Sequence, residues 1–344
     1  MSKDGVLRWL AGPVDRFRTP PMYPSFVSDG RLTAGYFTGR DSGFQIDIVS
    51  LDDQKRLARD VFFFAFKWSP RRAQLLALVA RPGRKSLSLV VIEPEAEEVT
   101  TVAKSAGSSF AWLEDGDSIA YIAFENNQPS LWVAKADGTE ARVLARGPVN
   151  RLAVSPDGRL IAFRRTADER GFRDQMWVVE VETGKLRRVP GPPLSEANGP
   201  DVWLDNETLV VHERRPGTGT QEHDAMRLDI DTGRRTLLAE DAVILGRSPD
   251  GSRLLAIREH RIGVNTRSEH EVIAVLTMRT DGTGERLLAV TDAEQGNIHG
   301  VPVFQPVVRE LSIAKDLAPP PGDEQRCRAE LSRFRDDVRR LTVG

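Results

Sequence analysis

The chain has 344 residues with 48 basic and 50 acidic side chains, and 40% of its residues are hydrophobic, which is typical of a globular protein. A single cysteine, Cys327, excludes an internal disulfide framework and a cysteine-rich metal site. The balanced charge argues against a nucleic-acid partner. With no apolar signal-peptide core and no run of about 18 apolar residues, we expect a cytoplasmic protein that does not engage a membrane.

A repeated fragment dominates the chain. VSPDGRLIAF at 154–163 has six relatives, and successive copies are about 44 residues apart, a period typical of propeller blades. The copies have their anchors at residues 27, 68, 112, 154, 203, 247 and 304. Two further short segments, 6–10 and 15–19, precede the first copy.

Each copy has the same internal order of strands and turns. An apolar strand ends in a turn such as Ser155-Pro156-Asp157-Gly158, in which proline presets φ and Asp-Gly accepts a positive φ. Two more strands follow, here 160–164 and 175–182, and a second tight turn at 182–185 leads to a short fourth strand. The pattern predicts a four-stranded antiparallel blade.

The SPDGRLIAF pattern resembles the TolB-like, or PD40, repeat, a relative of the WD40 repeat that also builds the propeller of prolyl oligopeptidase-family proteins. The resemblance covers residues 24–318 and implies an all-β propeller. It implies no peptidase activity, because the chain has no room for the hydrolase domain and lacks the G-x-S-x-G motif of its nucleophile.

Seven anchors predict a seven-bladed β-propeller over residues 1–320, with six blades as the alternative. The last unit has only two clear strands, within 298–316, so we expect the N-terminal strands in 6–19 to complete that blade and close the ring. In the tail, 321–344, the apolar residues Leu331, Phe334, Val338 and Leu341 recur at helical spacing. We expect a C-terminal amphipathic helix there.

The loops predict a binding face. If the first strand of each blade is innermost, the short SPDG turns lie at the bottom, and the long loops 164–174, 213–223 and 259–270 lie at the top. Long loops on a rigid scaffold commonly carry binding residues. The ligand-binding candidates near this face are Met22, Tyr23, Arg40, Asp41, Phe62, Arg165, Arg214, Arg215, His260 and Arg267.

Two classes of function remain open. The first is a binding module that presents its top funnel to a small molecule or a protein. The second is an enzyme that orients a partly hydrophobic metabolite for isomerisation or cyclisation, with His223, His270, His299 and Glu222 as candidate acid–base residues. A metal-dependent lactonase, with ligands such as Glu125, Asn126 and Asn127, is a weaker alternative. No cofactor and no dedicated metal site are expected.

Overall fold

The structure is a computed structural model, and the regular structure in its described residues is entirely β. The described residues are 22–26, 32–37, 44–49, 54–58, 62–80, 86–93, 96, 98–167, 173–195, 200–215, 223–248, 251–262 and 270–292. Within them no helix is long and apolar enough to cross a membrane.

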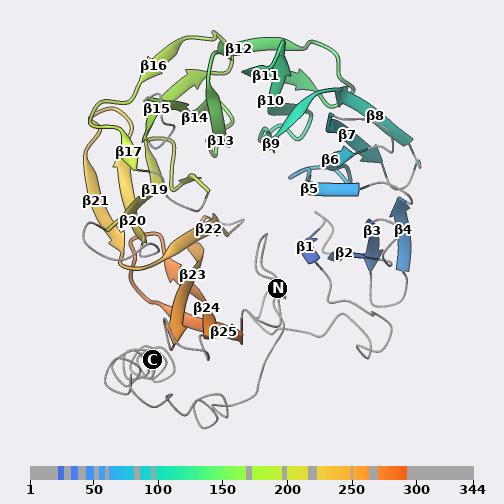
Figure 1. Ribbon diagram of the computed structural model, residues 1–344. Helices are drawn as coiled ribbons and strands as arrows, with labels where there is room; N and C mark the ends of the chain where they lie inside the picture. Colours follow the sequence, from blue (N-terminus) through green and yellow to red (C-terminus); the bar gives the residue numbers. More distant parts are fainter. Residues whose placement is uncertain are drawn as a thin grey trace. The chain divides into compact units, whose positions relative to one another are not determined.

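The described strands form six antiparallel sheets, and in each sheet the four main strands lie in sequence order (Figure 1). The sheets are β1 (Met22–Phe26), β2 (Leu32–Phe37), β3 (Phe44–Val49) and β4 (Gln54–Ala58); β5 (Phe62–Trp68), β6 (Leu75–Ala80), β7 (Ser88–Glu93) and β8 (Glu98–Ala103); β9 (Ala106–Trp112), β10 (Ser118–Glu125), β11 (Gln128–Lys135) and β12 (Arg142–Arg146); β13 (Val149–Val154), β14 (Leu160–Thr166), β15 (Arg173–Glu180) and β16 (Leu186–Arg188); β18 (Val202–Trp203), β19 (Thr208–Arg214), β20 (His223–Asp229) and β21 (Arg235–Ala239); and β22 (Val243–Arg247), β23 (Arg253–Ile262), β24 (His270–Arg279) and β25 (Arg286–Asp292). A two-residue strand, β17 (Leu194–Ser195), also pairs with β15.

The four-stranded antiparallel blade is therefore confirmed. In the repeat at 154–163, the turn has Gly158 at φ 72°, and Gly184 in the second turn has φ 70°, as the Asp-Gly and Thr-Gly sequences predict. The predicted closing blade (6–19 with 298–316) and the helix in 321–344 lie outside the described residues, so the count of seven blades, or six, stays a prediction.

The chain divides into two compact units. Unit 1 comprises Met1–Glu196 with the turns Asp205–Glu207 and Ile230–Gly233, and it contains the first four sheets. Unit 2 comprises Ala197–Leu204, Thr208–Asp229 and Arg234–Gly344, and it contains the strands from β18 onward.

The core lies between the faces of neighbouring sheets. In β6 the residues Leu75–Val79 are all buried, as expected for a strand covered on both faces. One apolar cluster joins the sheets β5–β8 and β9–β12, a second joins β9–β12 and β13–β16, and within unit 2 a third joins β18–β21 and β22–β25. Residues on both faces of the middle strands thus hold adjacent sheets together.

Two turn glycines lie close to main chain within their own units. In unit 1, a Cβ at Gly233, which has φ 71°, would lie 2.1 Å from the Pro190 carbonyl oxygen. A Cβ at Gly282, with φ 84°, would lie 2.4 Å from the Leu238 carbonyl oxygen. Glycine is thus required at both turns by its backbone conformation and by the space that the neighbouring main chain leaves.

Candidate functional site

A cleft of ≈ 670 Å³ lies in unit 1 and is lined by both the β9–β12 sheet and the β13–β16 sheet. Four tight turns meet there: those joining β9 to β10, β11 to β12, β13 to β14 and β15 to β16. Its apolar lining includes Leu113, Val133, Leu160 and Val181. The cleft therefore combines an apolar floor with polar turns from two rigid sheets.

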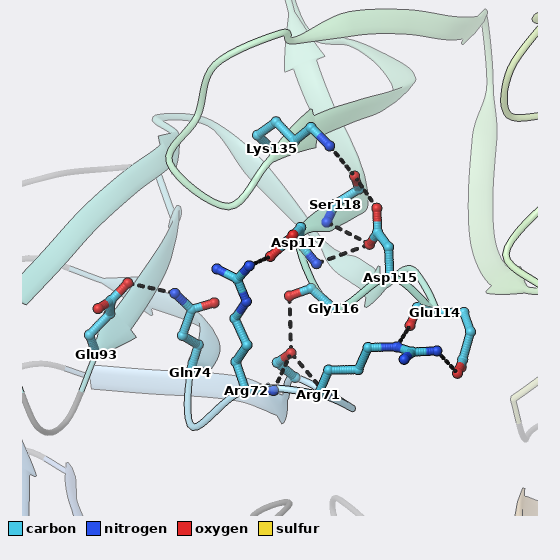
Figure 2. A network of polar contacts seen from close by, with 11 residues as sticks. Arg71, Arg72, Gln74, Glu93, Glu114, Asp115, Gly116, Asp117, Ser118 and Lys135 are labelled. Carbon is cyan, nitrogen blue, oxygen red and sulfur yellow. Dashed lines mark hydrogen bonds and ion pairs between the residues drawn. The ribbon is translucent and has the colours of Figure 1, made fainter.

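Asp115 is fixed by the turn between β9 and β10. Its carboxylate accepts hydrogen bonds from the backbone N–H groups of Asp117 and Ser118, at 3.0 and 2.8 Å, and from Ser118 Oγ at 2.7 Å (Figure 2). Burial alone would raise the pKa of Asp115, but these hydrogen bonds and the charge of Lys135 outweigh it and lower the pKa. The turn therefore holds an ionised carboxylate in one orientation.

Asp157 repeats this arrangement in the turn between β13 and β14. Its Oδ1 accepts hydrogen bonds from Ser155 Oγ at 2.7 Å and from the Arg159 N–H at 3.0 Å. Burial again opposes ionisation, but these bonds and the Arg159 charge lower the pKa of Asp157 overall. Both sheets thus contribute an oriented carboxylate to the cleft.

A second set of polar contacts fixes the β9–β10 turn from the neighbouring sheet (Figure 2). Arg71 donates from Nε to the Glu114 carbonyl oxygen at 2.5 Å and from Nη2 to the Glu114 carboxylate at 3.0 Å. Arg72 pairs with Asp117 at 2.6 Å, and Ser69 Oγ donates to the Gly116 carbonyl oxygen at 3.1 Å. The position of this wall of the cleft is therefore set before any ligand arrives.

Three further carboxylates in the cleft have no ion pair among the described residues: Glu140, Glu180 and Glu182. Of these, Glu180 accepts one hydrogen bond, from Thr183 Oγ1 at 2.7 Å. The basic lining residues are Lys135, Arg142 and Arg159, against six acidic ones: Glu114, Asp115, Glu140, Asp157, Glu180 and Glu182. The cleft is therefore negatively charged.

The predicted top loops are shorter than expected. Both β23 and β24 run for ten residues and take in both ends of the loop predicted at 259–270, so His260 and His270 are strand residues. Likewise β14 extends to Thr166 and β15 begins at Arg173. Regular backbone pairing continues through these charged residues, as far as Ile262 opposite His270 in one sheet and Thr166 opposite Asp174 in the other.

The structure describes the side chains of four predicted site residues. They are Arg165 in unit 1, and Arg214, Arg215 and His223 in unit 2. For five others the structure gives a strand position: Met22 and Tyr23 in β1, Phe62 in β5, His260 in β23 and His270 in β24. The remaining candidates lie outside the described residues: Arg40, Asp41, Glu222, Arg267 and His299.

Arg165 lies over aromatic rings at the opposite end of the β14 strand from the cleft. Its guanidinium carbon is 4.6 Å from the Trp177 ring centroid and 5.5 Å from that of Phe163. Nη2 donates to the Arg146 carbonyl oxygen at 3.0 Å, and burial lowers the pKa of Arg165. The side chain is thus oriented by cation–π contacts and a backbone acceptor.

The structure brings the three unit 2 candidates together where β19 and β20 meet. Arg214 lies opposite His223 in the strand register, and Arg215 makes a bidentate pair with Asp224, at 3.1 Å from Nε and 2.5 Å from Nη2. Burial raises the pKa of Asp224, but the Arg215 hydrogen bond, the Asp241 N–H and the charges of Arg215 and His223 lower it overall. Sequence reasoning did not identify Asp224 as the partner of Arg215.

Asn126 and Asn127, considered as metal ligands, have a conformational role in the hairpin between β10 and β11. Their φ angles are 51° and 63°, the left-handed pair that a two-residue hairpin requires and that asparagine tolerates. Among the described residues, no three His, Cys, Asp or Glu side chains gather as a metal site would need. The turn explains both asparagines.

Sequence reasoning missed the cleft because it assigned binding to the long loops and left the short turns as structural. The available signal was the run of acidic residues in turns of adjacent repeats, at 114–117, 137–140 and 180–182. Their convergence depends on which sheets pack together, which a single repeat does not show.

No family model and no curated protein sequence matches the chain. Solved structures do. Putative TolB from Agrobacterium tumefaciens aligns with a TM-score of 0.50 at 15% identity, over 70% of this chain and 85% of that one. An oligogalacturonate lyase in complex with manganese aligns with a TM-score of 0.53 at 14% identity, over 76% and 74% of the two chains.

Prolyl oligopeptidase B from Galerina marginata, as the apo protein, aligns with a TM-score of 0.57 at 12% identity, over 79% of this chain. This chain spans 44% of that protein and 60% of TolB from Acinetobacter baumannii. At these identities the likeness is one of fold, and it confirms the TolB-like propeller that the repeats predict.

Proposed function

We propose that the chain is a binding module and that the cleft between the β9–β12 and β13–β16 sheets is its binding site. The observation that supports this is the cleft itself, whose apolar floor and oriented polar rim have the composition of ligand sites. Asp115 and Asp157 are already held by their own turns, so a ligand would not have to order these two side chains.

The test is a fragment screen by saturation-transfer NMR on the wild-type protein and two tryptophan variants. Glu182→Trp places a bulky side chain at the exposed rim of the cleft, and Glu98→Trp places one on β8, outside the cleft. We expect a set of fragments that bind the wild type and the Glu98→Trp protein but not the Glu182→Trp protein. A screen in which Glu182→Trp retains every binder would contradict the proposal.

The second candidate is an enzyme that isomerises or cyclises a metabolite at the β19–β20 hairpin of unit 2. The observation in its favour is a buried His223 next to the Arg215–Asp224 pair, an arrangement that supplies an acid–base group beside a fixed charge. The test is turnover of candidate metabolites by the wild type and His223→Gln. Turnover that is equal in both proteins would exclude His223 from such a reaction.

A further inference from the structure

We infer that the ligand of this cleft is cationic, and specifically a peptide segment of a partner protein that carries arginine or lysine side chains. The inference rests on the proposed binding function of the cleft. It is drawn from the charges of the lining residues, from the contacts that already occupy the basic ones, and from the apolar floor between them.

The carboxylates outnumber the cations available to neutralise them. Glu140 and Glu182 are exposed on the turns of opposite sheets, and neither has an ion pair among the described residues. Glu180 lies beside them with a hydroxyl as its hydrogen-bond donor. Three negative charges contributed by the β9–β12 and β13–β16 sheets thus favour a ligand with more than one positive group.

The basic residues of the cleft are directed at other acceptors. Lys135 Nζ donates to Ser118 Oγ at 3.3 Å, and Arg142 Nη2 donates to the Val181 carbonyl oxygen. Arg159 is 3.9 Å from Asp157, its neighbour in the same turn. None of these contacts is to the carboxylate of Glu140, Glu180 or Glu182.

The apolar part of the cleft lining favours a basic side chain over a bare cation as the ligand. Leu113, Val133 and Leu160 would cover the methylene stem of an arginine or lysine while its charged end reaches the rim. A volume of ≈ 670 Å³ accommodates several side chains, far more than one ion requires. A short peptide with two basic residues flanking an apolar one matches both features.

The experiment uses three capped tripeptides as probes: Arg-Leu-Arg, its neutral isostere citrulline-Leu-citrulline, and Glu-Leu-Glu. Affinities come from chemical-shift titration of the full-length protein. We expect Arg-Leu-Arg to bind at least about threefold more tightly than the citrulline peptide, since two exposed ion pairs are lost with the charge. Its affinity should also fall as NaCl is raised from about 50 to 500 mM.

Variants locate the binding. Glu140→Gln and Glu182→Gln should each weaken Arg-Leu-Arg by about 1.5- to 5-fold, the effect of one exposed ion pair. Glu98→Gln removes a negative charge from β8, outside the cleft, and should leave the affinity unchanged. Equal losses in all three variants would indicate a general charge effect and overturn the inference.

The outcomes separate this inference from the proposed function. Equal affinity for the arginine and citrulline peptides, or no effect of both cleft variants, overturns the cationic ligand. If fragments still lose binding in Glu182→Trp, the cleft remains a binding site for another chemical class. If neither peptides nor fragments depend on the cleft, both proposals fail.

Discussion

At the scale of single residues, arginine side chains join segments far apart in the sequence by donating to backbone carbonyl oxygens. Arg142 donates to Val181, and Arg187 Nη1 donates to Ile230 at 2.7 Å, both within unit 1. In unit 2, Arg227 donates to Thr280. Each acceptor is the first residue after a strand, namely β15, β20 and β24. The chain has 40 arginines and 8 lysines, and part of that excess thus has a structural use.

Replacing Arg187 tests this use of arginine. Arg187→Met keeps much of the stem but removes the hydrogen bond to Ile230 and the 2.8 Å ion pair with Asp231. We expect the free energy of unfolding to fall by about 1–2 kcal/mol, measured by urea denaturation. Arg188→Met is the matched control, because Arg188 is exposed and its 3.3 Å contact with Gly191 is local. Equal losses in the two variants would contradict this structural role of Arg187.

Within unit 2, His212 is a hydrogen-bond acceptor for the backbone of another strand, whereas the arginines above are donors. It is 0% exposed, and its Nε2 accepts the Ile244 N–H at 2.8 Å, which requires that nitrogen to be unprotonated. His212→Leu should lower the free energy of unfolding by about 1–3 kcal/mol, because the Ile244 N–H is left buried without its acceptor. His212→Gln retains an acceptor oxygen and should recover part of the loss in the same urea assay. A glutamine variant no more stable than the leucine variant would refute this explanation.

At the scale of elements, the turns that hold Asp115 and Asp157 make the free energy of unfolding depend on pH in the acidic range. The pKa values of Asp115 and Asp157 are lowered in the folded state, so the unfolded state binds protons first as pH falls. Their stabilising contribution is therefore complete above the ordinary pKa of about 3.9 and disappears as pH falls through the lowered folded values.

The Asp115→Asn variant tests that dependence. The free energy of unfolding of the wild type should decline between about pH 5 and pH 2, and the decline should be shallower in Asp115→Asn, which has one fewer linked proton. Urea denaturation at a series of pH values measures both slopes. Glu98→Gln is the control, because Glu98 is an exposed residue of strand β8 and is not part of either aspartate turn. Parallel slopes for wild type and Asp115→Asn would rule out Asp115 as a source of the effect.

The turn glycines allow a second test at this scale. Two of them have the same backbone conformation, but only one of them has main chain close to the position of an added Cβ. Gly184 has φ 70° with nothing within 4 Å of an added Cβ, whereas an added Cβ at Gly233 would meet Pro190. Gly184→Ala should cost about 1 kcal/mol of unfolding free energy, the penalty for a left-handed alanine. Gly233→Ala should cost more, by at least about 1 kcal/mol, since main chain must also move. Equal losses in thermal and urea unfolding would contradict the close packing.

At the scale of the whole molecule, the repeat was the part of the structure most open to prediction. Its turn residues fix local conformation: Asp157-Gly158 predicts a positive φ, and the intervening apolar runs predict strands. Four strands per repeat follow from these local signals, and the solved structures confirm the propeller fold. The turns and strands of each repeat could be predicted from local sequence because each of them depends on a few neighbouring residues.

The candidate site was less predictable because it depends on contacts between repeats. Glu140 and Glu182 are 42 positions apart in the numbering, and only the packing of two sheets places both in one cleft. Arg215 was a sound candidate by residue type, but its bidentate pair with Asp224 gives it a role in the local structure. The enzyme candidates His299 and Glu222 lie beyond the described residues and remain predictions.

The interrupted outer strand of the β13–β16 sheet affects how the protein meets other copies of itself. β16 offers only three residues, and the chain then passes through Pro190, Pro192 and Pro193 before pairing again at β17. Proline has no N–H to donate, so this margin gives an incoming strand little backbone to pair with. The broken edge thus disfavours edge-to-edge strand pairing between this sheet and another copy.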